Sequence, residues 1–132
     1  MKKTLIYLAT PYSDPDPAVR ERRFLAVNAA AAVLMRGRLH VYSPISHTHP
    51  IALAGSLPLG WDYWEGYDRA ILENCAALVV LMLPGWEHSV GVAGERKIAE
   101  ELGIPIFYAT PGTIRGGIRR LREELPGYAE EA

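Results

Sequence analysis

The sequence predicts a single-domain, doubly wound α/β fold with a parallel sheet of about four to five strands, of the Rossmann-like or flavodoxin-like kind. Short, almost continuous apolar runs, typical of strands buried on both faces, alternate with longer amphipathic segments. The length of 132 residues suits one domain and leaves little room for a second. Helices that join parallel strands make right-handed crossovers, so we expect helices on both faces of the sheet.

Four apolar runs next to proline and glycine residues predict the strands. The first run ends at Thr10 and Pro11, and the second ends at Pro44. The run from Ala76 to Leu83 is the most apolar and predicts a central strand. The predicted strands span residues 4–9, 39–43, 76–83 and 104–109.

Helical periodicity and end signals predict the helices between these strands. Aspartate and proline residues precede an alanine- and arginine-rich segment that ends before Gly37, and Gly103 ends a later helix. Thr113 is expected to cap the last helix, whose apolar stripe closes before Pro126. The predicted helices span residues 18–36, 62–75, about 89–102 and 114–125.

Two segments are predicted to lie outside regular structure. Residues 44–60 are rich in proline and are interpreted as a long loop, a kind of connection that is usually functional or partly structured. The domain is expected to span residues 1–127. Residues 128–132 are interpreted as a frayed acidic tail.

Composition limits the classes of partner. With 14 basic and 15 acidic residues the net charge is −1, so we expect neither a nucleic acid polymer nor a membrane surface as partner. The single cysteine, Cys75, excludes an internal disulfide framework and fits a reducing cytoplasm. No Cys/His spacing resembles a zinc module, and no cofactor or metal is expected.

Residues 83–108 carry the strongest functional signal, because they end one predicted strand, open a helix and enter the next strand. Glycines in this stretch let the backbone turn sharply, and Ser89 is expected at or near the first helical turn. Unpaired N–H groups at such a helix end attract phosphates and carboxylates. The turn therefore predicts a site for an anionic group.

Two carboxylates interrupt otherwise apolar helix faces. Val92, Ala99 and Leu102 define one face, and Glu95 lies on it at helical spacing. Asp68 falls on the apolar side of the preceding helix. A buried carboxylate pair suits bond cleavage at an anomeric carbon. The alternatives are that Glu95 bonds a basic group or the backbone, and that Asp68 pairs with an arginine of another helix.

Other side chains are expected at the same edge, because ligands of doubly wound sheets bind beyond the carboxyl ends of the strands. Pro11 and Ser13 follow the first strand. His47 and His49 follow the second, where alternate residues of an extended segment would point the same way, either to line the pocket or to hold a metal that lacks an evident third ligand. Trp64 belongs to an aromatic cluster that would stack on a nucleobase or form a subunit contact.

The chain resembles the nucleoside 2-deoxyribosyltransferase superfamily, and most closely an uncharacterised branch with ATPYS-type, SPISHTHPI-type and LPGW segments. The resemblance runs from Tyr7 to about Tyr108. Within the superfamily, N-hydrolases that release a base from deoxynucleoside 5′-monophosphates carry an S-x-G-V-x-x-E signature. Residues 89–95 match this signature at every fixed position.

The resemblance implies a site and a reaction. Glu95 would be the nucleophile at C1′, and Asp68 would protonate or orient the leaving base. Tyr7 would hold the Glu95 carboxylate through a hydrogen bond, unless it merely buries its ring. Ser89 and the amide of Gly91 would receive a 5′-phosphate, so that the ligand would be a small nucleoside or nucleotide.

Alternatives in function and assembly stay open. The chain lacks the glycine- and arginine-containing loop of the N-hydrolases, and Arg20 either supplies that positive charge or is solvated. A noncatalytic nucleotide-binding or sensing module is the alternative to the enzyme, and a flavodoxin-like electron carrier is less favoured. A homo-oligomer, a dimer or larger, is expected because relatives often complete their sites across subunits.

Overall fold

In the computed structural model, which describes residues 2–129, four parallel strands form one sheet in the order β2-β1-β3-β4. The strands are β1 (Ile6–Ala9), β2 (Val41–Tyr42), β3 (Ala77–Leu81) and β4 (Ile106–Ala109). The helices are α1 (Pro17–Arg36), α2 (Pro44–Gly55), α3 (Trp61–Leu72), the short 3₁₀ helix η1 (Trp86–His88), α4 (Val90–Leu102), α5 (Gly117–Glu124) and α6 (Pro126–Ala129). The predicted α/β class and all-parallel sheet are confirmed.

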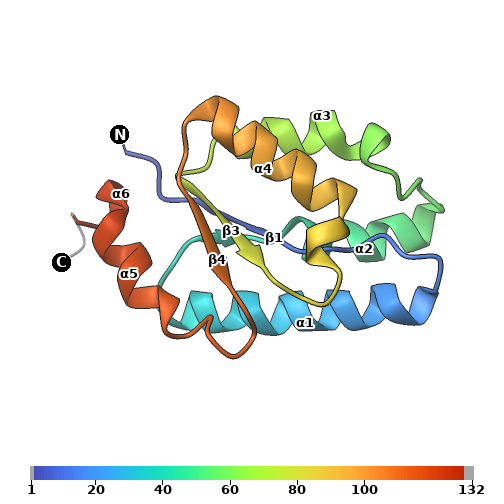
Figure 1. Cartoon of the computed structure of the whole chain (residues 1–132), viewed down its shortest axis with the longest axis horizontal. Helices are drawn as coiled ribbons and strands as arrows, with labels where there is room; N and C mark the ends of the chain where they lie inside the picture. Colours follow the sequence, from blue (N-terminus) through green and yellow to red (C-terminus); the bar gives the residue numbers. More distant parts are fainter. Residues whose placement is uncertain (1, 130–132) are drawn as a thin grey trace.

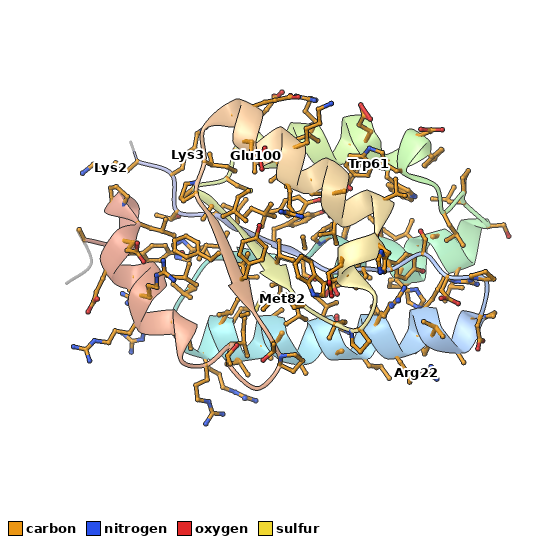
Figure 2. All side chains as sticks on the ribbon, in the orientation of Figure 1. Lys2, Lys3, Arg22, Trp61, Met82 and Glu100 are labelled. Atoms are coloured by element: carbon orange, nitrogen blue, oxygen red, sulfur yellow. The ribbon has the colours of Figure 1, made fainter. Side chains whose placement is uncertain are left out.

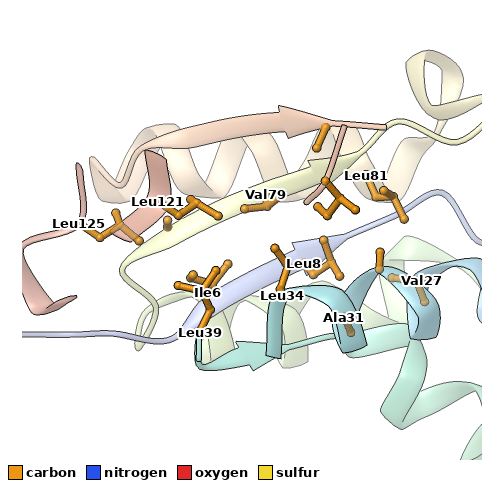
Figure 3. Close-up of a cluster of buried hydrophobic side chains, with 14 of the residues drawn as sticks. Ile6, Leu8, Val27, Ala31, Leu34, Leu39, Val79, Leu81, Leu121 and Leu125 are labelled. Carbon is orange, nitrogen blue, oxygen red and sulfur yellow. The ribbon is translucent and has the colours of Figure 1, made fainter. Parts of the chain in front are cut away.

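Helices cover both faces of the sheet, so the protein has three layers (Figure 1). On one face, Ile6 and Leu8 pack with apolar residues of α1 and α5, as Figure 3 shows. On the other face, Tyr7 and Ala9 pack against α3 and α4. This alternation follows from the two-residue period of a strand, and it puts Tyr7 in the layer that contains both candidate carboxylates.

End signals set the limits of the two long helices as predicted. Asp16 caps α1 by accepting a hydrogen bond from the amide of Ala18 at 2.9 Å, and Pro17 occupies the first helical position. Gly103 ends α4 in the left-handed conformation, with φ of 71°. The predicted apolar face of α4 is wrong at its last residue, because Leu102 is exposed.

The predicted loop at residues 44–60 is wrong over most of its length, since α2 forms there. Pro44 occupies the first turn, where no N–H group is needed, and the Thr48 hydroxyl donates to its carbonyl at 2.9 Å. Pro50 lies inside the helix, and Ser56 ends it in the left-handed conformation. The prolines indicated a loop, but Pro44 suits the first turn of a helix and α2 continues past Pro50 although that residue has no N–H group to donate.

The end of the chain packs against the domain instead of fraying at residue 128. Tyr128 is 2% exposed, accepts from the amide of His40 at 2.8 Å and donates to the carbonyl of Thr4 at 2.7 Å. A side chain at Gly127 would meet the carbonyl oxygen of Lys3 at 2.5 Å, so this close approach requires glycine. The rest of the predicted tail, residues 130–132, lies outside the described residues.

The expected cap at Thr113 is also wrong. Its hydroxyl accepts from the amide of Thr110 at 2.8 Å within a turn, and α5 begins only at Gly117. The apolar stripe of this helix is nevertheless buried, with Ile114, Leu121 and Leu125 in the core. Within residues 2–129, no helix combines the length and the apolar character needed to cross a bilayer.

Candidate active site

A cavity of about 210 Å³ lies at the carboxyl ends of the strands, the edge where ligands of such sheets bind. Its walls come from the segment after β1, from α2 and α3, and from the first turns of α4. The residues that line it are Thr10, Tyr12, Ser13, Pro44, Ile45, Thr48, His49, Ala52, Leu59, Trp61, Trp64, Asp68, His88, Ser89, Val90, Gly91 and Glu95.

Asp68 and Glu95 both line this cavity from neighbouring helices. Asp68 belongs to α3 and is 8% exposed, whereas Glu95 belongs to α4 and is 5% exposed. Figure 1 shows these helices side by side on one face of the sheet. No basic side chain within residues 2–129 forms an ion pair with either carboxyl, and the nearby Arg69 pairs with Glu101 at 3.2 Å.

Burial and proximity perturb the titration of both carboxyls. Burial raises the pKa of Asp68 to about 6, and the Tyr7 hydroxyl opposes part of that rise. Burial raises the pKa of Glu95 well above its ordinary value of 4.5, and the negative charge of Asp68 raises it further, against the effect of Tyr7. The carboxyl pair therefore holds a proton to a higher pH than two isolated carboxyls would.

Tyr7 reaches the carboxyl pair from beneath, in the middle of β1. It is 0% exposed, and its hydroxyl is close enough to Glu95 and Asp68 to influence both, yet it completes no hydrogen bond within residues 2–129. Burial and the two negative charges raise the pKa of Tyr7, so the phenol stays protonated and acts only as a donor toward the carboxyls.

The first turn of α4 forms the expected helix end beside the carboxyls. Ser89 is the N-cap, and its hydroxyl accepts from the amide of Val92 at 3.1 Å. The amides of Val90 and Gly91 have no partner within the helix because they precede its first hydrogen-bonded turn. Ser89, Val90 and Gly91 all line the cavity, so these donors lie at its wall.

Close packing between α3 and α4 shapes one wall of the cavity. The Trp61 ring, labelled in Figure 2, lies against Gly94, where an added Cβ would sit only 2.4 Å from the indole. Glycine at this position lets the aromatic wall approach the helix that carries Glu95. The aromatic cluster predicted from the sequence thus contributes Trp61 as well as Trp64 to the cavity.

Of the other predicted site residues, some line the cavity and some do not. Ser13 and His49 line the cavity, and Ser13 donates to the carbonyl of Leu59 at 2.9 Å. Pro11 is buried but does not line the cavity. His47 is exposed and lines a separate groove between α2 and α3. The two histidines diverge because they lie on a helix, where residues two apart face different sides.

Two residues of the segment after β1 were missed as site residues. Tyr12 lines the cavity, and so does Thr10, whose buried hydroxyl has no hydrogen-bond partner within the described residues. Only their position at the end of a predicted strand pointed to them. An unpaired buried hydroxyl costs stability, and this one belongs to a residue at the cavity wall.

The sequence profile of a domain of unknown function, DUF1937, matches residues 4–111. The chain belongs to the DUF1937 family. The DUF1937 match runs from the strand that carries Tyr7 through β4, and it contains every residue that lines the cavity. No protein with a curated description shows a significant match to the chain.

The polar groups that line the cavity of this DUF1937 domain are carboxyls, hydroxyls, helix amides and the imidazoles of His49 and His88. Among residues 2–129, no three His, Cys, Asp or Glu side chains gather closely enough to hold a metal ion. The buried carboxyl pair and the first turn of α4 lie at the wall of the cavity, and the Tyr7 hydroxyl lies close to both carboxyls.

Thr10→Val should stabilise the free DUF1937 domain by roughly 1 kcal/mol, because it replaces an unpaired buried hydroxyl with a methyl group of similar size. Thermal or denaturant unfolding measures this change. Thr48→Val is the matched control and should destabilise, since the buried Thr48 hydroxyl donates to Pro44. Unfolding of Thr10→Val below the parent temperature would contradict an unpaired hydroxyl.

Proposed function

We propose that this protein cleaves the N-glycosidic bond of a nucleoside or nucleoside 5′-monophosphate and either hydrolyses the sugar ester or transfers the sugar to another base. The observation that carries the proposal is the pair of buried carboxyls, Asp68 and Glu95, in one cavity without a basic partner among residues 2–129. Burying two such groups is costly, so a function is needed to account for them. The resemblance to the nucleoside 2-deoxyribosyltransferase superfamily supplies that function.

In the proposed reaction, the Glu95 carboxylate attacks C1′ and the bond from C1′ to the base nitrogen breaks. The leaving base takes the proton of Asp68, and a glycosyl ester with Glu95 remains. Water or a second base then attacks C1′, and its proton goes to the Asp68 carboxylate while Glu95 is released. Atoms and charge balance without a cofactor.

In this proposal, binding of the substrate changes which carboxyl of the Asp68–Glu95 pair carries the proton. In the free protein, burial and the negative charge of Asp68 favour the protonated form of Glu95, whereas attack needs an ionised Glu95. A base nitrogen that accepts a hydrogen bond from Asp68 favours the protonated form of Asp68. Binding of the correct base would therefore move the proton from the nucleophile to the acid.

A 5′-phosphate is supported by the helix end beside the carboxyls. The first turn of α4 presents the amides of Val90 and Gly91 and the capping hydroxyl of Ser89 at the cavity wall. A helix N-terminus attracts a phosphate through these donors and its dipole. Phosphorylated substrates should accordingly be preferred to the matching nucleosides.

The test is chromatographic detection of free base from a panel of ribo- and deoxyribonucleosides and their 5′-monophosphates, with and without an acceptor base. Base release by the parent and its absence in Glu95→Gln would support the proposal. New nucleoside formed with the acceptor would make the protein a transferase. Binding of a nucleotide without any base release would favour the noncatalytic sensing module instead.

A further inference from the structure

A chain of hydrogen bonds that involves neither Asp68 nor Glu95 also reaches the cavity, from α1, α2 and the segment after β1. The Glu21 carboxylate on α1 lies 2.8 Å from Nε2 of His49 on α2. Nδ1 of His49 is hydrogen-bonded to the hydroxyl of Tyr12, which follows β1. Both His49 and Tyr12 line the cavity. This chain, Glu21–His49–Tyr12, has no part in the proposed cleavage.

The positions of the protons in this chain follow from its donors and acceptors. An ionised carboxylate only accepts, so Nε2 of His49 must carry the hydrogen that points to Glu21. In a neutral imidazole Nδ1 is then a lone pair, and Tyr12 must donate its proton to it. Arg20, which also approaches the Tyr12 oxygen, has no lone pair with which to compete for that proton.

Packing holds the imidazole in place. His49 is 3% exposed, its ring lies 4.4 Å from that of Phe24 between centroids, and it meets the Tyr12 ring edge to face at 5.4 Å. The three polar residues come from α1, α2 and the segment after β1, so their alignment depends on the tertiary fold. With its proton turned to His49, the Tyr12 oxygen has only lone pairs left, and the Arg20 guanidinium donates toward one of them.

We propose that Tyr12 is a specificity-determining residue that presents a hydrogen-bond acceptor to the ligand, and that Glu21 sets this polarity through His49. The group that it recognises is a hydrogen-bond donor, such as the exocyclic amino group of adenine or cytosine, and the carbonyl of the corresponding keto base is disfavoured. The choice of ligand class rests on the proposed function, whereas the polarity of Tyr12 rests on the hydrogen bonds alone.

Substitutions in the Glu21–His49–Tyr12 chain should change the hydrogen bonding of Tyr12 in different ways. Tyr12→Phe removes the acceptor. Glu21→Gln can donate its amide hydrogen to Nε2, which allows the tautomer with hydrogen on Nδ1 and lets Tyr12 donate toward the cavity. Arg22→Gln is the control, since Arg22 is an exposed neighbour of Glu21 on α1 and is labelled in Figure 2.

The experiment compares the affinity of matched amino and keto nucleotides by calorimetry at about pH 8, where imidazoles are ordinarily neutral. The probes are the monophosphates of adenosine against inosine and of cytidine against uridine. The parent should bind the amino member roughly 10-fold tighter or more, since one base contact is worth about that ratio. Tyr12→Phe should bring the ratio near one, Glu21→Gln should lower or invert it, and Arg22→Gln should leave it unchanged.

A ratio that is the same in the parent, Tyr12→Phe and Glu21→Gln would overturn the proposal, as would a parent that prefers keto bases. Heteronuclear NMR of the imidazole nitrogens, assigned with His49→Gln, tests the polarity without any ligand. Hydrogen on Nε2 supports the proposal, and hydrogen on Nδ1 overturns it. Base release without the expected ratios would leave the proposed function standing, whereas the expected ratios without base release would leave the polarity standing.

Discussion

Glu95→Gln should lower base release by roughly 10⁴-fold or more while it makes the protein more stable at neutral pH. The loss follows because an amide oxygen cannot attack C1′ as a carboxylate does. Because Gln has nearly the same size and shape as Glu, the cavity should keep its form and the variant should still bind nucleotide. Mass spectrometry of acid-quenched protein should find a sugar attached to the parent and none on the variant.

The gain in stability follows from the raised pKa of Glu95. Its folded-state pKa lies well above the ordinary 4.5, so the folded protein holds a proton that the unfolded chain releases as pH rises. The stability associated with the protonated carboxyl is therefore complete below pH 4.5 and is lost as pH rises toward the folded-state pKa. Gln has no such proton to lose.

Thermal unfolding of parent and Glu95→Gln should thus nearly coincide in acid and diverge as pH rises. Glu100→Gln is the matched control, because Glu100 is exposed on the same helix and should change neither activity nor this pH dependence. Full base release by Glu95→Gln would remove the proposed nucleophile. Destabilisation of the variant at neutral pH would contradict the titration of Glu95.

Asp68→Asn should lower base release by about 10² to 10⁴-fold for ordinary bases, the usual contribution of a general acid. It should cost far less with a purine methylated on its imidazole ring, because that base already carries a positive charge and leaves without a proton. The ratio of the two losses measures acid catalysis directly. Equal losses with both substrates would indicate that Asp68 positions the substrate and does not protonate it.

The pH profile offers a second measure of the same residue. The active parent holds one proton on the carboxyl pair, so kcat/KM should rise as the pair loses its first proton, near the Asp68 pKa of about 6, and fall as the pair loses its last proton. In Asp68→Asn the charge that raises the pKa of Glu95 is gone. Its profile should therefore keep one ascending limb, set by Glu95, at a lower pH than the descending limb of the parent.

Stability provides a control for Asp68 that does not depend on activity. Its raised pKa means that Asp68 lowers the stability of the parent as pH rises from 3.8 to about 6, so Asn should make the fall over this range shallower and leave the part that the buried Glu95 contributes. Asp62→Asn is the matched control, since Asp62 is exposed in the first turn of the same helix. A parent whose stability does not change over this pH range would contradict a buried, proton-holding Asp68.

Helical spacing located the two carboxyls because it depends only on local geometry. Glu95 and Asp68 each stand on an apolar face, and any helix formed by those residues had to bury them. Strand alternation likewise directed Tyr7 to one face of the sheet. That these three meet in one place required only the parallel order of neighbouring strands, which short apolar runs between helices had already indicated.

Contacts between segments that lie far apart in the sequence could not be predicted from periodicity. His47 and His49 were expected to point together, but α2 separates them, and its formation depends on where each proline falls in the helical turns. The bonds from His49 to Glu21 and to Tyr12 join residues 28 and 37 positions apart. No periodicity in the sequence signals such a connection, because it arises only when α1, α2 and the end of β1 pack together.

The last two helices, α5 and α6, lie beyond the family match but belong to the folded core. The family match stops at residue 111, but Leu121, Leu125 and Tyr128 complete the core beneath the α1 face of the sheet. Tyr128 also ties the entrance of β1 to the chain just before β2 through its hydroxyl. A segment cut at the limits of the family match would therefore contain every proposed catalytic residue and still expose the apolar side of the sheet that α5 and α6 cover. We therefore expect a stably folded unit to extend through α6, although the proposed site residues end at Glu95.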